Sequence, residues 1–571
     1  MNERIEKEND GNILEIENLH LEFRSHGIWR EVVKGVNFSL KKGETLGLVG
    51  ESGSGKSVSA LATMGLLDKN NSKITQGRIL FDSSVDLLQL SEKEMRKYRG
   101  GKIAMIFQEP MTSLNPVVKC GKQVVEMILQ HEDCSKKDAE KKVLELFDEV
   151  LLPNPSRVFD SYPHELSGGQ KQRVMIAMAI ACKPEVLIAD EPTTALDVSV
   201  QKAVLDLIKT VQQKYGMGVV FISHDLGIVH SISDRIAVIY KGSIVETGDR
   251  DSVFLNPQHP YTKGLLACRP SMNERPKRLP TVDDYLNGTN NDNDVITQEE
   301  RSKQHSEIYS QEPILQVRDL EVEYVLNKNL FGKSKKTLKA VDKVGFDLYR
   351  GETLGLVGES GCGKTTLGRA IMQLVENSSG NIVFENRILN CKSHSELKKV
   401  RRDIQIIFQD PYSSLNPKIT VGQAIGEPLK TYSIESDAKK RKALVVEMME
   451  KVGLDASHYE RYPHEFSGGQ RQRIGIARAL ILRPKIVICD ESVSALDVSI
   501  QAQVLNLLAD LKREFGLTYI FISHDLAVVK YVSDRMIVMR KGKVIQIDEA
   551  DKVYSAPSDE YVKTLIDSIP S

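Results

Sequence analysis

Two eight-residue stretches of this 571-residue chain have the residue types and spacing of a phosphate-binding loop. Residues 50–57 read Gly-Glu-Ser-Gly-Ser-Gly-Lys-Ser, and residues 358–365 read Gly-Glu-Ser-Gly-Cys-Gly-Lys-Thr. Glycines allow the turn to point successive N–H groups at a phosphate, the lysine adds positive charge, and the last hydroxyl can coordinate Mg²⁺. The candidate residues are Gly50, Gly53, Gly55, Lys56 and Ser57, then Gly358, Gly361, Gly363, Lys364 and Thr365.

Repetition separates this pattern from an ordinary turn rich in glycine and serine. Both stretches are entered from the same apolar segment, Thr-Leu-Gly-Leu-Val, at residues 45–49 and 353–357. The sequence therefore predicts two nucleotide sites, each on a turn between a strand and a helix.

A pair of carboxylates follows an apolar run in each half of the chain. Residues 186–189 lead into Asp190 and Glu191, and the second half repeats the pair as Asp490 and Glu491. One carboxylate can orient Mg²⁺ and its waters while the other polarises the attacking water, as hydrolysis of a nucleoside triphosphate requires. We expect the aspartates to bind metal and the glutamates to be catalytic.

Two further polar residues fall at predicted strand ends. Gln108 could reach the metal or the attacking water, and His224 could hydrogen-bond the γ-phosphate. Alone, each would fit a structural role as well. They recur as Gln409 and His524, so we expect the glutamines to contact nucleotide or metal and the histidines to take part in catalysis.

A third motif, Ser-Gly-Gly-Gln, predicts a second anion-binding helix start in each half. The serine is a good N-cap, and the glycines leave the first N–H groups of the helix open. One phosphate group rarely needs two cradles from one domain, so we expect each motif to serve the nucleotide held by the other half. The motif residues are Ser167, Gly168, Gly169 and Gln170, then Ser467, Gly468, Gly469 and Gln470.

Strands and helices must alternate to position these residues. After the Ser-Gly-Gly-Gln motif, the hydrophobic pattern predicts a helix, a strand, a helix and a strand at residues 172–182, 186–189, 200–215 and 219–222. Such units imply an α/β fold with a mostly parallel sheet and ligands at the carboxyl ends of its strands.

The motifs repeat at a spacing of 300 residues for the aspartates and for the histidines (490 − 190 and 524 − 224). A period this long indicates a duplicated domain. Between the copies, the chain is polar and rich in Asn and Asp, too poor in apolar groups to fold alone. We expect a polar tail at 1–12, domains at 13–270 and 314–571, and a flexible linker at 271–313.

Composition argues against several function classes. There are 77 Lys and Arg residues against 78 Asp and Glu, so no overall charge draws the chain to nucleic acid. No apolar run reaches the roughly 20 residues of a membrane-spanning helix, and the charged N-terminus does not resemble a secretory signal. The seven cysteines contain no Cys-x-x-Cys pair, which argues against a disulfide framework and against zinc or iron–sulfur ligation. We therefore expect a cytosolic location.

Together these motifs resemble those of the ABC ATPases, over nearly the whole chain outside the tail and linker. The resemblance implies two tandem P-loop NTPase domains of α/β class, each with a mostly parallel sheet, an antiparallel β portion and a helical subdomain. It implies a head-to-tail pair that sandwiches two ATP molecules with Mg²⁺. Each site would combine the phosphate loop, glutamine, carboxylate pair and histidine of one domain with the Ser-Gly-Gly-Gln motif of the other.

The resemblance also assigns roles to residues outside the main motifs. Asp197 and Asp497 match a loop that signals between the sites. Phe23 and Tyr324 are candidates to stack on adenine, although aromatic residues near strand ends also serve the core. Both halves keep a complete set, which predicts two hydrolytic sites. Ser492 replaces the proline that follows the catalytic glutamate in the first half, which predicts a looser turn and unequal rates.

An extension narrows the class further. Residues 255–267 resemble the C-terminal extension of the peptide, nickel and glutathione importer ATPase family, while the copy at 557–561 is a weaker match. The resemblance implies an ATP-hydrolysing subunit that energises a membrane importer of peptides or similar small solutes. Its partners would be two transmembrane permease subunits and an extracytoplasmic solute-binding protein, and no nucleic acid. It would be peripheral, at the cytoplasmic face of the membrane.

Two alternatives stay open. A twin-cassette ATPase that acts on the ribosome would share the duplication, although a helical and strongly basic linker would be expected there. The ATPase of an exporter with separate permeases would share the same motifs. Substrate and permeases cannot be identified from this sequence, because selection lies with the partners.

Overall fold

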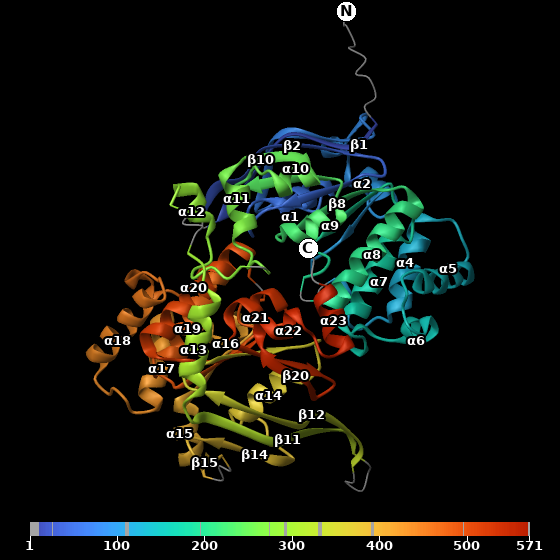
Figure 1. The fold of residues 1–571 in the computed structure, drawn as a ribbon. Coiled ribbons are helices and arrows are strands. Elements are labelled where there is room, and N and C mark those ends of the chain that lie inside the picture. Colours follow the sequence, from blue (N-terminus) through green and yellow to red (C-terminus); the bar gives the residue numbers. More distant parts are fainter. Residues whose placement is uncertain are drawn as a thin grey trace, which may run out of the picture. The chain divides into compact units, whose positions relative to one another are not determined.

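The computed structural model describes residues 11–25, 27–108, 113–194, 196–272, 274–289, 294–328, 334–389, 393–494 and 496–568. The chain divides into two compact units, each with one copy of the repeat (Figure 1). The first unit takes residues up to 266 together with 282–289, and the second takes 267–281 and residues 290–569. Residues 1–10 of the predicted polar tail lie outside the described residues.

A six-stranded sheet in the order β10-β9-β3-β8-β7-β6 forms the centre of the first unit. The pairs β3–β8, β3–β9, β7–β8 and β6–β7 are parallel, and β10 joins β9 antiparallel. β3, β7 and β8 are buried throughout, as parallel strands covered on both faces must be. The strands are β3 (Thr45–Val49), β6 (Ile103–Ile106), β7 (Val186–Asp190), β8 (Gly218–Ser223), β9 (Arg235–Tyr240) and β10 (Ser243–Asp249).

The second unit repeats this sheet in the order β16-β17-β18-β13-β19-β20, with β20 antiparallel to β19. The predicted mostly parallel sheet is confirmed in both halves. The strands are β13 (Thr353–Val357), β16 (Ile404–Ile407), β17 (Ile486–Asp490), β18 (Thr518–Ile522), β19 (Arg535–Arg540) and β20 (Lys543–Glu549).

Each unit also carries a four-stranded antiparallel sheet, as the resemblance implies. The orders are β2-β1-β4-β5 and β12-β11-β14-β15. The first contains β1 (Asn12–Ser25), β2 (Ile28–Lys41), β4 (Ser72–Phe81) and β5 (Val85–Asp86). The second contains β11 (Pro313–Lys328), β12 (Ser334–Tyr349), β14 (Ser379–Phe384) and β15 (Arg387–Ile388).

A helical subdomain, also expected, is present in each unit. In the first, α4, α5 and α6 pack on one another and α4 and α5 pack on α7, and in the second α17 and α18 pack on each other and on α19. Among the described residues, no helix is long and apolar enough to cross a membrane. Helices of the first unit include α1 (Lys56–Thr63), α2 (Glu92–Tyr98), α4 (Cys120–His131), α5 (Lys136–Glu149), α6 (Pro155–Asp160), α7 (Gly168–Ile180), α8 (Val198–Tyr215), α9 (Leu226–Ile232), α10 (Arg250–Leu255) and α11 (Pro260–Ala267). Those of the second include α14 (Lys364–Ile371), α15 (His394–Asp403), α16 (Pro411–Ser414), α17 (Val421–Thr431), α18 (Ala438–Lys451), α19 (Gly468–Leu480), α20 (Val498–Phe515), α21 (Leu526–Val532), α22 (Ala550–Ser555) and α23 (Glu560–Asp567).

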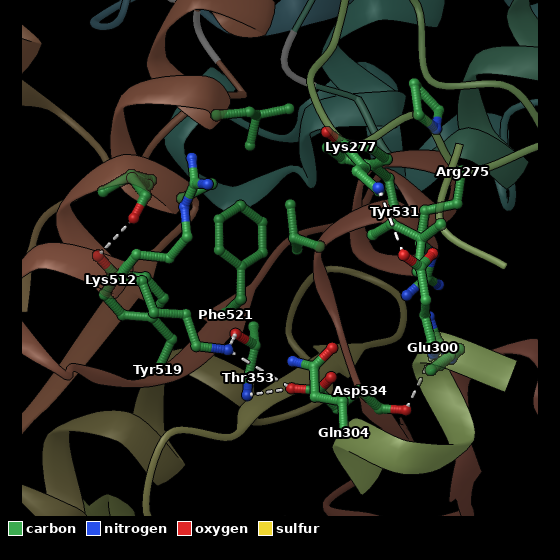
Figure 2. Close-up of a pocket in the computed structure, with 18 residues that line it drawn as sticks. Arg275, Lys277, Glu300, Gln304, Thr353, Lys512, Tyr519, Phe521, Tyr531 and Asp534 are labelled. Atoms are coloured by element: carbon green, nitrogen blue, oxygen red, sulfur yellow. Dashed lines mark hydrogen bonds and ion pairs between the residues drawn. The ribbon is translucent and has the colours of Figure 1, made fainter. Parts of the chain in front are cut away.

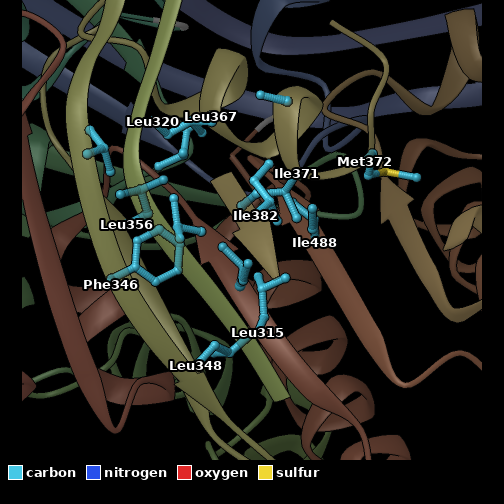
Figure 3. Close-up of a cluster of buried hydrophobic side chains, with 14 of the residues drawn as sticks. Leu315, Leu320, Phe346, Leu348, Leu356, Leu367, Ile371, Met372, Ile382 and Ile488 are labelled. Carbon is cyan, nitrogen blue, oxygen red and sulfur yellow. The ribbon is translucent and has the colours of Figure 1, made fainter. Parts of the chain in front are cut away.

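The hydrophobic core of the second unit anchors the helix that follows its phosphate loop. Figure 3 shows Leu367 and Ile371 of α14 among buried residues of both sheets, such as Leu320 and Leu356. The first unit has an equivalent cluster that includes Ala60 and Ala62 of α1. Each phosphate loop is therefore held between a buried strand and a helix packed into the core.

The segment expected to be a flexible linker contains two helices, α12 (Val282–Asn287) and α13 (Gln298–Tyr309). Near its start, Leu279 exchanges two hydrogen bonds with Asn506 of α20, from N to Oδ1 at 2.9 Å and from Nδ2 to O at 2.8 Å. In α13, Arg301 donates to the Ser533 carbonyl at 3.1 Å. Polar contacts thus order parts of a segment that is too polar to form a core of its own.

A cavity of about 380 Å³ lies between this segment and the body of the second unit (Figure 2). Tyr519 and Phe521, both on β18, line the cavity from one side. At its base, the Asp534 carboxylate accepts a hydrogen bond from the Thr353 N–H at 2.8 Å and lies 3.5 Å from the Lys512 ammonium. The linker therefore covers a charged cluster of the second unit.

Candidate active sites

The glycines of each phosphate loop lie where a side chain would collide with neighbouring backbone. A Cβ on Gly50 would lie 2.2 Å from the Ile239 carbonyl oxygen, and one on Gly363 would lie 2.1 Å from that of Ala340. Gly55 and Gly363, both at φ +109°, are the N-caps of α1 and α14 and make no side-chain capping bond. By contrast, a Cβ on Gly53 or Gly361 would meet nothing within 4 Å, although both have φ +77°. The first glycine and the last glycine of each loop thus pack closely against neighbouring strands, whereas the middle glycine faces open space.

The loop lysine is buried and held by carbonyl groups of its own loop. The Lys56 Nζ atom donates to the carbonyl oxygens of Gly50 and Glu51, both at 2.7 Å. The Lys364 Nζ atom donates likewise to Gly358 at 2.6 Å and Glu359 at 3.0 Å. The positive charge therefore lies at the helix N-terminus, which favours an anion on its own account.

The last hydroxyl of each loop meets the first carboxylate of the pair. Ser57 Oγ donates to Asp190 Oδ1 at 2.9 Å, and Thr365 Oγ1 donates to Asp490 Oδ1 at 2.9 Å. Burial raises the pKa of Asp190 to about 6, although the Ser57 hydrogen bond opposes that rise. Mg²⁺ takes one or two such oxygen ligands together with phosphate oxygens, so this pair fits the ion.

Glu191 lies at the centre of a cluster of polar side chains. Its Oε2 atom accepts from Gln108 Nε2 and from Thr194 Oγ1, both at 3.0 Å, and lies 3.4 Å from His224 Nδ1. Burial raises the pKa of Glu191, but the hydrogen bond and charge of His224 outweigh it, so the pKa is about 2. The side chain is thus a carboxylate at neutral pH that can orient and polarise a water.

The equivalent Glu491 has a different set of contacts. Gln409 Nε2 donates to its Oε2 atom at 2.7 Å, and His524 Nδ1 lies 3.7 Å away. Ser494, which replaces the threonine, donates instead to the Glu491 backbone carbonyl at 2.8 Å. Burial raises the pKa of Glu491, yet the His524 hydrogen bond and charge lower it below the ordinary value. In the first half, the Thr194 hydroxyl donates to the glutamate carboxylate. In the second half, the Ser494 hydroxyl donates to the glutamate backbone and leaves the carboxylate without that contact.

The turn after the carboxylates is the same in both halves. Glu191 has φ 46° and Glu491 has φ 48°, a strained conformation for residues other than glycine. Each donates its N–H to a strand carbonyl, that of Ile222 at 3.0 Å and Ile522 at 2.9 Å. Ser492 is buried beside Cys489. The turn therefore has the same backbone conformation and the same hydrogen bond to the neighbouring strand with proline or with serine after the glutamate. The looser turn expected from Ser492 stays a prediction.

The Ser-Gly-Gly-Gln motifs start α7 and α19, and their serines are N-caps as predicted. Ser167 Oγ accepts from the Gln170 N–H at 3.3 Å, and Gln170 Oε1 accepts from the Ser167 N–H at 3.0 Å. Ser467 and Gln470 make the same reciprocal pair at 3.4 and 3.1 Å. The glutamine thus stabilises the helix start, a capping role that its residue type allowed us to foresee but that we did not assign.

The remaining predicted residues have distinct surroundings. Phe23 is partly buried against the core of the first unit, whereas Tyr324 is 39% exposed. Asp197 and Asp497 are the N-cap residues of α8 and α20 and make no side-chain capping bond there. Ala195 and Ala495, two residues earlier in the same segments, lie outside the described residues.

Sequence reasoning missed Thr194 and the tyrosine of each extension. Thr194 carries a hydroxyl that reaches the glutamate three residues before it. Tyr261 and Tyr561 reach the phosphate loops from more than 200 residues away. Tyr261 and Tyr561 are 300 residues apart (561 − 261), the spacing of the repeat, and this recurrence is the sequence signal that could have identified them.

A family model described as ABC transporter matches residues 33–194 and 341–494, more than half of the chain. A second model, the C-terminal region of oligopeptide/dipeptide transporters, matches residues 245–291. This chain therefore belongs to the ABC transporter family, and it is an ATP-binding protein that hydrolyses ATP.

Its relatives include the glutathione import ATP-binding protein GsiA of Escherichia coli O157:H7 and of Shigella dysenteriae serotype 1 (strain Sd197). Each is 47% identical over 574 residues, which cover 98% of this chain and 90% of the relative. Among solved structures, the ATP-binding cassette MJ0796, a dimer bound to ADP and Pi, is 27% identical with a TM-score of 0.38. It matches 41% of this chain and 98% of its own.

Proposed function

We propose that this chain is the ATPase subunit of a membrane importer of peptides or glutathione-like solutes. The observation that carries the proposal is the 47% identity to GsiA over 98% of the chain, extension included. This match favours an importer over a ribosome-acting ATPase or an exporter. The partners would be two permease subunits and an extracytoplasmic solute-binding protein, and the chain would bind the cytoplasmic face of the membrane through the permeases.

Each ATP would be bound by the phosphate loop of one half and the Ser-Gly-Gly-Gln motif of the other. The geometry of α7 and α19 supports this, since the first two residues of each helix are glycines and the first of them has little or nothing beside it. A Cβ on Gly168 would meet only Leu196 at 3.8 Å, and one on Gly468 would meet nothing within 4 Å. A phosphate could therefore approach the backbone at either helix start.

In each site, the residues of this chain divide the chemistry among them. Ser57 and Asp190 would hold Mg²⁺ in the first site and Thr365 and Asp490 in the second, with Gln108 and Gln409 beside them. Bound Mg²⁺ would neutralise charge that develops on the phosphates. Lys56 and Lys364 would bind terminal phosphates.

In each site, one glutamate would orient the attacking water. Glu191 and Glu491 are ionised and are held in fixed positions by neighbouring glutamine and histidine side chains. His224 and His524 would add a hydrogen bond to the γ-phosphate, which strengthens as charge develops in the transition state.

The catalytic assignment is tested with the double variant Glu191→Gln and Glu491→Gln. Both amides keep the size of the side chain but cannot polarise water as a carboxylate does. We expect ATP turnover to fall by about 100-fold or more, while binding of a fluorescent ATP analogue is retained. Full turnover by the double variant would remove both glutamates from the catalytic role.

Importer function is tested in proteoliposomes that contain the chain and two candidate permease subunits. We expect the solute-binding protein loaded with glutathione or a peptide to stimulate ATP hydrolysis and to drive uptake. The double glutamine variant is the control and should support no uptake. Stimulation of ATP hydrolysis by ribosomes, or ATP-driven transport of the solute in the direction opposite to import, would overturn the proposal.

A further inference from the structure

A tyrosine from the C-terminal extension of each unit bonds to the backbone of that unit's phosphate loop. The Tyr261 hydroxyl, on α11, accepts a hydrogen bond from the Glu51 N–H at 3.0 Å. The Tyr561 hydroxyl, on α23, accepts one from the Glu359 N–H at 3.3 Å. The same contact thus occurs twice in one chain, between segments about 200 residues apart.

The peptide group that the tyrosine holds is also the one that holds the loop lysine. The Gly50 carbonyl and the Glu51 N–H belong to one peptide unit, and that carbonyl accepts from Lys56 Nζ at 2.7 Å. In the second unit, Gly358 accepts from Lys364 Nζ at 2.6 Å. A hydrogen bond at one end of a peptide polarises it and strengthens the bond at the other. The tyrosine therefore sets the orientation of the carbonyl that positions the lysine.

Packing holds each tyrosine in place. Tyr261 is fully buried, and its ring centroid lies 4.2 Å from that of Tyr240. Tyr561 is 7% exposed, and the Arg540 guanidinium lies 4.5 Å from its ring centroid. Such a buried ring loses little further freedom when its hydroxyl bonds to the loop.

The start of each extension helix is secured as well, although by different residues. The Tyr261 N–H donates to His259 Nδ1 at 3.1 Å, and the Tyr561 N–H donates to Asp559 Oδ1 at 2.8 Å. One reason why the second extension is a weaker match in sequence is that Asp559 stands where the first has His259. Both residues accept the same backbone hydrogen bond, so the tyrosine is placed alike in both units.

We propose that Tyr261 and Tyr561 are positioning residues for ATP: they fix the peptide unit that joins the first two residues of each phosphate loop and, through it, the lysine. This inference rests on the proposed function, because it takes the loops to be the ATP sites. The extension then has a role in the nucleotide site of its own unit, and a displacement of α11 or α23 weakens ATP binding there.

The test uses the full chain with Tyr261→Phe, Tyr561→Phe and the double variant, which remove the hydroxyl and keep the ring. Loss of one such hydrogen bond predicts about 3- to 10-fold weaker binding of a fluorescent ATP analogue, with a larger rise in KM than fall in kcat. The effect should be greater at Tyr261, whose bond is shorter. Amide exchange at Glu51 or Glu359 should quicken in the matching variant, whatever the nucleotide.

The matched control is Tyr215→Phe, which removes a hydroxyl that donates to Glu149 Oε2 at 3.0 Å in the first unit. We expect it to leave ATP affinity and exchange at Glu51 unchanged. Unchanged ATP affinity in the double variant, while the wild type still hydrolyses ATP, overturns the positioning role alone. A wild-type chain that binds no ATP overturns the proposed function and this inference with it.

Discussion

At the scale of single residues, Thr194 beside the first glutamate corresponds to Ser494 beside the second, a difference of one methyl group. Thr194 places its hydroxyl on the Glu191 carboxylate, whereas Ser494 turns its hydroxyl to the Glu491 backbone. Threonine has few allowed side-chain rotamers because it is β-branched, and serine has more freedom. Unequal rates are therefore expected from the residue three positions after the glutamate, and the turn itself is the same in both halves.

This difference is tested with Thr194→Val and Ser494→Ala. Valine keeps the shape of threonine but removes a hydrogen bond to a charged group, so we expect hydrolysis at site one to slow by about 10-fold. Ser494→Ala leaves the contacts of the Glu491 carboxylate in place and should slow site two much less. Each variant is measured by ATP turnover with the other half's glutamate replaced by glutamine. Equal effects would show that the threonine bond does not act on catalysis.

At the scale of elements, adjacent glycines at the start of α7 have separate tasks. A Cβ on Gly169 would lie 2.7 Å from Val200 Cγ1 of α8, so this glycine permits close helix packing. A Cβ on Gly168 would make only an ordinary contact with Leu196 at 3.8 Å, and the task of this glycine would be to leave room for a phosphate. The second half repeats the arrangement, since a Cβ on Gly469 would lie 2.5 Å from Ile500 Cγ2.

Alanine at each of these two positions should therefore give opposite results. Gly169→Ala forces α7 and α8 apart, and we expect a loss of about 1–3 kcal/mol of stability, seen as a lower Tm. Gly168→Ala should keep the Tm of the wild type while ATP turnover falls at the site that it serves in the other half. A normal turnover rate for Gly168→Ala would contradict the role proposed for the motif.

The sequence allowed the buried elements to be predicted better than the polar ones. Strands such as Val186–Asp190 are short apolar runs that end in a carboxylate, so their place at the sheet centre follows from composition. Helix α13 has no apolar stripe, and its contacts reach residues more than 200 positions away. No local pattern reports such contacts. The Tyr261 bond to Glu51 is equally distant in sequence, and for the same reason it was not foreseen.

At the scale of the whole molecule, the linker is divided between the units. Residues 267–281 belong to the second unit, 282–289 to the first, and the chain after 290 to the second again. Asp534 lies where the linker meets the second unit, with His305 Nε2 of α13 at 3.5 Å and Lys512 Nζ at 3.5 Å. The expected linker is thus a docked segment over much of its described length.

Asp534 should make the second unit sensitive to acid. Burial raises the pKa of its carboxyl, but the charge of Lys512, the nearby His305 imidazole and the Thr353 N–H lower it to about 2, below the ordinary 3.8. The carboxylate therefore contributes stability, on the order of 2 kcal/mol, that is fully present above pH 4 and lost as pH falls from about 4 to 2. Asp534→Asn should lower the Tm of the second unit at pH 7 and flatten its dependence on pH over that range. Calorimetry of the full chain measures both, with Asp234→Asn, at the equivalent position, as control.

Two arginines hold the linker to the second unit, and their loss should release it. Arg275 Nη1 and Arg301 Nη2 donate to the same Ser533 carbonyl at 3.2 and 3.1 Å, and both side chains also approach Asp551, at 3.4 and 3.1 Å. The two arginine side chains are only 15% and 12% exposed, whereas Asp551 is 48% exposed. The hydrogen bonds to the Ser533 carbonyl are therefore expected to hold the linker more strongly than the partly solvated ion pairs do. We expect the double variant Arg275→Ala and Arg301→Ala to quicken amide exchange across α13.

Lys303→Ala, on the exposed side of the same helix, is the matched control and should leave exchange unchanged. The Tm of the second unit should fall by less than in Asp534→Asn, because the sheet and the core do not depend on these arginines. Exchange in α13 that stays slow in the double variant would mean that the helix holds its place through the buried side chains of His305 and Ile308. The position of α13 on the second unit would then depend on side-chain packing and not on the arginine hydrogen bonds.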